Sequence, residues 1–208
     1  MKKRFIGVYN PTILLTYAGV FCAIVGIGLL LYVPCTCLSK TMDIVMVMLI
    51  TAGVCDMFDG AVARHFDRTE KEIQFGIQLD SLADTVSFVA FPAIILMSVV
   101  ENKFISVPIA CFYVFAGVMR LGWFNVTTEE NHGIYMGLPV TFTAVIFPVS
   151  YLVLRMLDLS CVQIVFPALY ACVGLLFILN FRLKKLQMPA LVFLAIVAIA
   201  GTVGLLLI

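Results

Sequence analysis

The sequence predicts an all-α, polytopic membrane protein: a helical bundle with six core transmembrane helices and a seventh expected at the end of the chain. Two features of the composition support this fold class. Hydrophobic residues make up 63% of the 208 residues and charged residues only 12%, whereas a soluble domain has about 25% charged residues. The mean hydropathy is +1.13. A water-soluble fold of this size could not bury so much apolar surface, which excludes most soluble enzyme folds and disordered chains.

The third observation is that apolar residues gather in runs of about 18 residues or more, long enough to cross a hydrocarbon core about 30 Å thick. The polar connections between the runs are short, so we expect one integral membrane domain over 1–208. The second run carries Asp56 and Asp59 near its end, and the third carries Asp80 and Asp84 in its first half. In chain order, the expected spans are 13–33, 44–62, 75–100, 104–121, 135–156, 162–181 and 186–208.

The distribution of basic residues predicts the orientation of these spans. If the N-terminus is cytoplasmic and every run crosses the membrane, the cytoplasmic segments hold ten of the 13 Lys and Arg residues and the outer segments hold three. This asymmetry follows the positive-inside rule. It places the aspartates of the second and third spans near the cytoplasmic face. The formal net charge is only +1, which gives no indication of a nucleic-acid partner.

The aspartates are arranged in two pairs. Asp56 and Asp59 are three residues apart, and Asp80 and Asp84 are four apart, so each pair shares one face of its helix. The short connection makes the two helices antiparallel neighbours, and the pairs can meet. An ionised Asp within a span costs roughly 2.5–3.5 kcal/mol on insertion scales, and converging carboxylates repel one another. We therefore expect one or two divalent cations with oxygen ligands here; a solvated helix end is the alternative.

Small residues flank these carboxylates. Gly60, Ala61, Ala63 and Gly76 add little side-chain bulk beside the aspartates. Such residues let membrane helices pack closely, and they also let a phosphorylated ligand approach the backbone.

The segment from Asp56 reads DMFDGAVAR and, after 11 intervening residues, GIQLDSLAD. It resembles the signature of the CDP-alcohol phosphotransferase family, DxxDGxxAR…GxxxDxxxD. The resemblance implies an enzyme that transfers a phosphatidyl-type group from a CDP-linked lipid to an alcohol and releases CMP. The signature positions are Asp56, Asp59, Gly60, Ala63, Arg64, Gly76, Asp80 and Asp84.

The same resemblance implies roles for these residues. All four signature aspartates would bind one or two Mg²⁺ or Mn²⁺ ions, and Asp84 would also act as the general base. The CDP-lipid would be held by Asp56, Gly60, Ala63, Arg64 and Gly76. Members of the family are commonly homodimers, so a homodimer is expected as well.

Further elements resemble the phosphatidylserine synthase branch of that family. They are the segment QLDSLADTVSFVAFPA around Asp80 and Asp84, the segment RLGWFNV from Arg120 to Val126, and the segment MGLPVT from Met136 to Thr141. The resemblance implies CDP-diacylglycerol as donor and L-serine as acceptor. Arg120 is a candidate for binding the serine carboxylate, and an interfacial anchor is its alternative role.

Three features depart from that branch. First, Val89 and Phe91 replace a Gly and an Ala that are typical of the branch. Second, Trp123 replaces a second Arg. Third, the connection from Arg64 to Gly76 is longer than usual. Other acceptors therefore stay open, among them glycerol 3-phosphate or an inositol phosphate, and so does an ether-lipid donor. A cation transporter is an alternative from a different class of function, but the four aspartates cluster near one face instead of lining a path through the bilayer.

Overall fold

The computed structural model describes residues 8, 13–32, 38–63, 66–127, 134–157, 162–184, 197, 200–201 and 203–204. The described part of the chain forms a helical bundle, which confirms the predicted all-α membrane fold. Its elements are α1 (Leu14–Tyr32), α2 (Leu38–Ala63), α3 (Glu70–Asp84), the π-helical segment η3 (Thr85–Ala90), α4 (Phe91–Val99), α5 (Lys103–Thr127), β1 (Ile134–Met136), the 3₁₀ turn η4 (Val140–Phe142), α6 (Thr143–Leu157), α7 (Val162–Ile178) and β2 (Arg182–Lys184).

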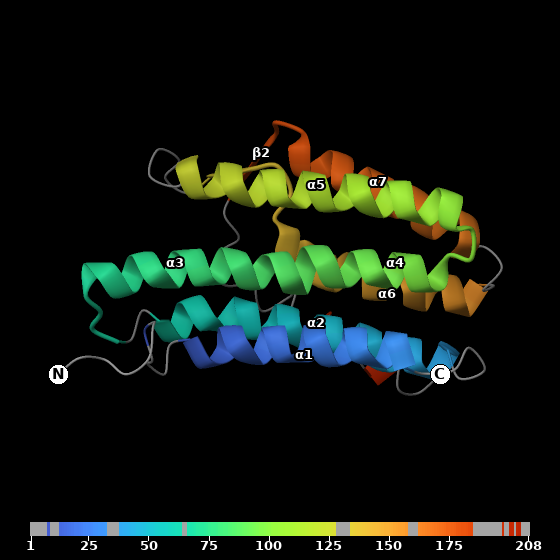
Figure 1. The fold of residues 1–208 in the computed structure, drawn as a ribbon, viewed down its shortest axis with the longest axis horizontal. Helices are drawn as coiled ribbons and strands as arrows, with labels where there is room; N and C mark the ends of the chain where they lie inside the picture. Colours follow the sequence, from blue (N-terminus) through green and yellow to red (C-terminus); the bar gives the residue numbers. More distant parts are fainter. Residues whose placement is uncertain are drawn as a thin grey trace.

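Helices α3, η3 and α4 form one long rod through the middle of the bundle (Figure 1). The rod has α1 and α2 on one side and α5 and α7 on the other, and α6 packs against α2. In the described part of the chain, five helices are long and apolar enough to cross a membrane, and α7 is a shorter apolar helix. The predicted seventh span, 186–208, lies almost entirely outside the described residues.

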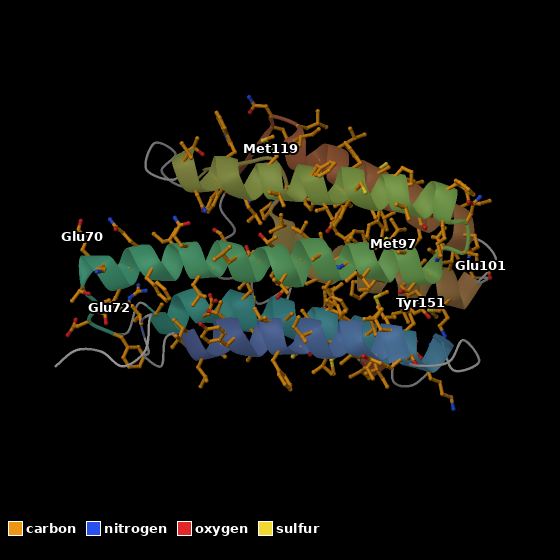
Figure 2. All side chains as sticks on the ribbon, viewed as in Figure 1. Glu70, Glu72, Met97, Glu101, Met119 and Tyr151 are labelled. Carbon is orange, nitrogen blue, oxygen red and sulfur yellow. The ribbon has the colours of Figure 1, made fainter. Side chains whose placement is uncertain are left out.

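Helix α3 begins five residues before the predicted boundary because its first turn is polar and capped. The Thr69 hydroxyl accepts a hydrogen bond from the Glu72 amide, and the Glu72 carboxylate accepts one from the Thr69 amide at 2.9 Å. This reciprocal pair satisfies amides that the helix itself cannot. Glu70 and Glu72 lie at the free end of α3, and Glu101 lies at the opposite end of the bundle (Figure 2).

The fifth predicted span was wrong at its start. Helix α6 begins at Thr143, whereas β1 pairs antiparallel with β2 in the segment before it, a short ribbon that the sequence did not predict. Gly137 separates the ribbon from η4 with a φ of +71°, a left-handed conformation that a helix cannot contain. A Cβ atom at this position would lie 2.9 Å from the Phe177 carbonyl oxygen, so the close contact with the end of α7 also requires glycine.

The π-helical segment η3 directly follows Asp84, and its origin is local. In an α-helix the Phe88 carbonyl would accept from the amide of residue 92, but Pro92 has no N–H. The amide of Phe91 instead donates to the Val86 carbonyl five residues back. The Tyr113 hydroxyl of α5 donates to the Phe88 carbonyl at 2.6 Å, in the buried core. A side chain from another helix thus replaces the missing backbone donor.

Two further interactions fix the helices around this rod. The Phe147 and Tyr170 rings stack with centroids 3.9 Å apart, joining α6 to α7. At the end of the bundle away from the aspartates, Arg155 of α6 forms an ion pair with Asp43 of α2. The start of α2 is therefore connected to the end of α6.

We predict that Gly53→Ala destabilises the protein. A Cβ atom at Gly53 would lie 2.5 Å from the Ala144 Cβ of α6, which is attached to the backbone and cannot rotate away. Overpacking of this kind costs about 1–3 kcal/mol. The change should lower the thermal unfolding midpoint in detergent.

Gly28→Ala is the matched control, because no atom lies within 4 Å of a Cβ placed there. We expect it to leave the midpoint unchanged or to raise it slightly, as helix propensity favours alanine. Equal midpoints for the two variants would contradict the close α2–α6 contact.

Candidate active site

The four aspartates lie near the end of the bundle where α2 ends and α3 begins (Figure 1). Asp56 and Asp59 occupy the last turns of α2, and Asp80 and Asp84 occupy the second half of α3. Helix α1 packs against both α2 and α3 and so forms one wall of the site. The predicted convergence of the two helical faces therefore occurs, with α1 as an additional element.

Three of the four carboxylates form a tight group. Asp56, Asp80 and Asp84 each offer an oxygen atom, and these atoms all lie within 4.8 Å of one another. Asp84 is the most enclosed, with 8% of its surface exposed. Carboxylate oxygens are the ligands that hard divalent cations prefer. The chemistry and the spacing of this group fit a metal ion.

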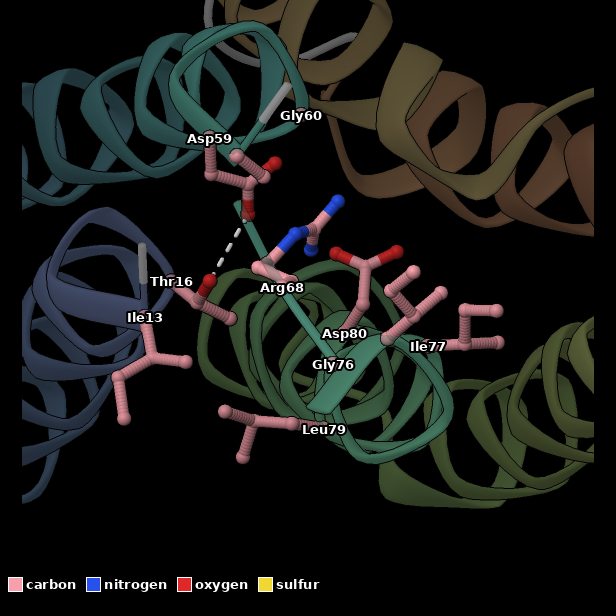
Figure 3. A pocket seen from close by; sticks show the side chains of 11 residues that line it. Ile13, Thr16, Asp59, Gly60, Arg68, Gly76, Ile77, Leu79 and Asp80 are labelled. Atoms are coloured by element: carbon pink, nitrogen blue, oxygen red, sulfur yellow. Dashed lines mark hydrogen bonds between the residues drawn. The ribbon is translucent and has the colours of Figure 1, made fainter. Parts of the chain in front are cut away.

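Asp59 is placed differently from the other three. Its carboxylate accepts a hydrogen bond from the Thr16 hydroxyl of α1 at 2.9 Å, and Asp59 is not part of the group of three oxygens (Figure 3). No functional role was predicted for Thr16, although it is a hydroxyl residue near the start of a largely apolar first run.

A cavity of about 230 Å³ opens beside Asp59 and Asp80 (Figure 3). It contains three of the small or glycine positions that the sequence analysis assigned to the CDP-lipid. Of the other two predicted contacts, Asp56 does not line this cavity and Arg64 lies outside the described residues. The lining residues are Ile13, Thr16, Asp59, Gly60, Ala63, Arg68, Ile73, Gly76, Ile77, Leu79 and Asp80.

A second, much smaller cavity of about 10 Å³ lies deeper in the bundle, comparable to the space that one water molecule needs. Asp56, Asp59 and Asp84 line it together with Thr16. Thr16 and Asp59 therefore border both cavities. The hydrogen bond between them therefore lies in the lining that the two cavities share.

Arg120 lies apart from this site. It is 7% exposed, and its guanidinium carbon lies 4.9 Å from the centre of the Phe124 ring. It lines a separate cavity of about 330 Å³ between α5 and the end of α7, which contains none of the four aspartates. The structure therefore does not bring Arg120 into the cavity of the metal-binding candidates.

Helix α5 nevertheless contacts the aspartate-bearing helix through a polar pair. The Ser81 hydroxyl, one residue after Asp80, donates to the Asn125 side-chain oxygen at 3.0 Å. Asn125 belongs to the RLGWFNV segment. The sequence analysis gave Asn125 no role, because only the tertiary structure brings α5 beside α3.

A comparison with known protein families identifies the family of this chain. The sequence profile of the CDP-alcohol phosphatidyltransferase family matches residues 10–179. The chain belongs to this family. The matched range includes both aspartate pairs and all helices from α1 to α7.

Several curated relatives are similar over shorter segments. An archaetidylserine synthase of Methanothermobacter thermautotrophicus is 32% identical over 116 residues, which is 55% of this chain and 49% of the relative. A CDP-diacylglycerol–serine O-phosphatidyltransferase of Saccharomyces cerevisiae is 42% identical over 82 residues, 39% of this chain and 29% of the relative. The Bacillus subtilis protein of that name is 28% identical over 131 residues, 62% of this chain and 68% of the relative.

The chain spans about half the length of the first of these relatives. No solved structure matches it with significance. Divalent-metal dependence is general in this family, and the aspartate group described above provides suitable ligands.

We predict that the purified protein binds Mn²⁺ through this group. Asp56→Asn and Asp80→Asn should each weaken Mn²⁺ binding by about tenfold or more, because each change removes a charged ligand. Electron paramagnetic resonance of free Mn²⁺ measures the effect.

Asp67→Asn is the matched control, since Asp67 is exposed in the connection before α3. It should leave the Mn²⁺ affinity unchanged. If all three variants bind Mn²⁺ as tightly as the original protein, the metal is not held by this group.

Proposed function

We propose that the protein is a CDP-diacylglycerol–serine O-phosphatidyltransferase, which transfers a phosphatidyl group from CDP-diacylglycerol to the hydroxyl of L-serine and produces phosphatidylserine and CMP. The observation that carries the proposal is the group of three carboxylates beside a cavity lined by the small signature residues, in a chain of this transferase family. The names of several relatives, which specify serine O-phosphatidyl transfer, support serine as the acceptor.

The reaction exchanges one phosphate ester bond for another. The serine hydroxyl oxygen forms a bond to the phosphorus of the phosphatidyl group. The bond from that phosphorus to the bridging pyrophosphate oxygen breaks, and CMP leaves with the electron pair. Asp84 accepts the proton that the hydroxyl loses, a role for which a buried carboxylate next to the reacting group is suited. Its enclosed position at the deep end of the site limits access of water.

Asp56, Asp59, Asp80 and Asp84 would hold Mg²⁺ or Mn²⁺. When bound, the divalent cation would neutralise charge on the phosphate that is transferred. Thr16 orients Asp59 by donating its hydroxyl hydrogen, which leaves the other carboxylate oxygen of Asp59 available. Gly60, Ala63 and Gly76 allow the CDP group to approach the helix backbone, and Arg64 belongs to the same proposed binding set.

The membrane setting fits an amphiphilic donor. Its acyl chains can remain in the lipid while the CDP group enters the cavity at the end of the bundle. From the excess of basic residues in alternate segments, we assign this end and the N-terminus to the cytoplasmic side. A homodimer is proposed on family grounds alone.

Two alternatives have the same chemistry but a different donor or acceptor. The archaetidylserine synthase relative favours an ether-linked CDP-lipid donor as the second candidate, with the same acceptor. A phosphorylated acceptor, such as glycerol 3-phosphate or an inositol phosphate, would require further cations. Among the described residues that line the 230 Å³ cavity, Arg68 is the single basic one. Family membership favours group transfer over cation transport.

The donor and acceptor can be tested together by direct measurement of CMP release. We expect release with CDP-diacylglycerol, Mn²⁺ or Mg²⁺ and L-serine, and little release with glycerol 3-phosphate or inositol phosphate. An ether-linked CDP-lipid in the same panel distinguishes the second candidate. The absence of CMP with every donor and acceptor would overturn the transferase assignment.

Asp84→Asn should lower the rate of CMP release by about 10²-fold or more, because the amide cannot accept the serine proton. Binding of CDP should remain measurable by calorimetry, which separates loss of the base from loss of the site. Asp67→Asn should keep the full rate. An Asp84→Asn protein with unchanged turnover would contradict the general-base role.

A further inference from the structure

Arg68 is the one basic side chain among the described residues lining the 230 Å³ cavity. It is not part of the family signature, and it lies in the connection that is longer than usual between the two halves of that signature. Figure 3 shows its guanidinium group in the cavity, between Asp59 on α2 and Asp80 on α3. No sequence pattern distinguishes Arg68 from the other basic residues expected near this end of the bundle.

Two features of α3 hold Arg68 in this place. Thr69 caps the helix through the reciprocal hydrogen bonds with Glu72, so the backbone next to Arg68 is fixed. The Arg68 side chain lies along α3 over Gly76, because a Cβ atom at Gly76 would be at van der Waals distance, 3.7 Å, from Arg68 Nη1. The guanidinium group thus occupies the space over a glycine of the signature.

The charges around the cavity indicate what Arg68 can bind. Among the residues that the structure describes, no ion pair within 4.0 Å joins Arg68 to Asp59 or Asp80. Its guanidinium group therefore faces the cavity beside these carboxylates without being held by either of them. The other lining residues are apolar, small or a hydroxyl. A ligand that fits this arrangement carries closely spaced anionic oxygens, to which a planar guanidinium group can donate two parallel hydrogen bonds.

We propose that Arg68 binds the pyrophosphate of the CDP-linked donor and so sets the affinity for the donor. The inference rests on the proposed function and extends it to a residue outside the signature. The cavity it enters contains Gly60, Ala63 and Gly76, which are the positions assigned to the donor. The proposed metal ion would offset the repulsion between the aspartates and the donor phosphates on one side, and the Arg68 guanidinium group adds a positive charge on the cavity side.

Steady-state kinetics in mixed micelles test this role, with the donor and serine varied separately. Arg68→Gln should raise the KM for the CDP-lipid by about tenfold or more, as expected for loss of a charge-assisted hydrogen bond. The KM for serine should change by less than about twofold, because the lost hydrogen bond is to the donor and not to serine. Arg68→Lys should restore part of the donor affinity, because lysine keeps the charge but loses the paired donors.

Lys71→Gln is the matched control, since Lys71 is exposed on the first turn of α3 and does not line the cavity. Its kinetic constants should equal those of the original protein. Thermal unfolding of each variant establishes that it is folded.

Calorimetry with CDP and with CMP, in the presence of Mn²⁺, provides a second readout that does not depend on turnover. Arg68→Gln should weaken binding of CDP more than binding of CMP, since only CDP carries a pyrophosphate. Equal loss for both nucleotides, no loss, or an increase confined to the KM for serine would overturn the assignment; the last result would give Arg68 to the acceptor carboxylate.

The two levels of the proposal fail in different ways. If the original protein releases no CMP with any acceptor, the proposed function fails, and the comparison of CDP with CMP still decides the role of Arg68. If the original protein is active and Arg68→Gln binds CDP normally, only the role of Arg68 fails.

Discussion

Mutual repulsion among carboxylates at the end of an apolar bundle is the constraint on which the rest of this structure depends. Asp56, Asp80 and Asp84 bring their oxygens within 4.8 Å of one another, and ionised groups in such surroundings are costly. The surrounding structure offsets this cost in several ways. The Thr16 hydroxyl satisfies Asp59, Arg68 brings a positive charge into the adjoining cavity, and the oxygen ligands suit a divalent cation.

The central rod of α3, η3 and α4 links this charged end to the apolar core. Pro92 removes the backbone donor that the Phe88 carbonyl would otherwise use, and the Tyr113 hydroxyl replaces it from α5. The resulting π-helical segment begins directly after Asp84, and such segments are frequent at functional sites. One continuous helix therefore carries both the buried carboxylate of Asp84 and the Phe88 carbonyl that the Tyr113 hydroxyl contacts.

Several parts of the fold and site followed from the sequence because they depend on local spacing. The apolar runs predicted the ends of α1 and α7 to within three residues, whereas α2 begins six residues before and α5 ends six residues after the predicted bounds. The boundary errors arose where a polar residue pattern acts locally, at the Thr69 cap and at the left-handed Gly137. Arg120 shows the limit for the site: the sequence indicated a cation near the end of a helix, but the structure places it in a different cavity.

The sequence by itself determined the membrane fold, the two aspartate pairs and the family signature, since residues three or four apart on one helix must share a face. The tertiary structure decided which of those residues meet. It left Asp59 outside the group of three oxygens, brought Thr16 and Arg68 to the cavity, and placed Arg120 in a different cavity. The physical reason is that distances between helices depend on packing, on capping and on small residues such as Gly53 at close contacts, which no spacing along a single helix encodes.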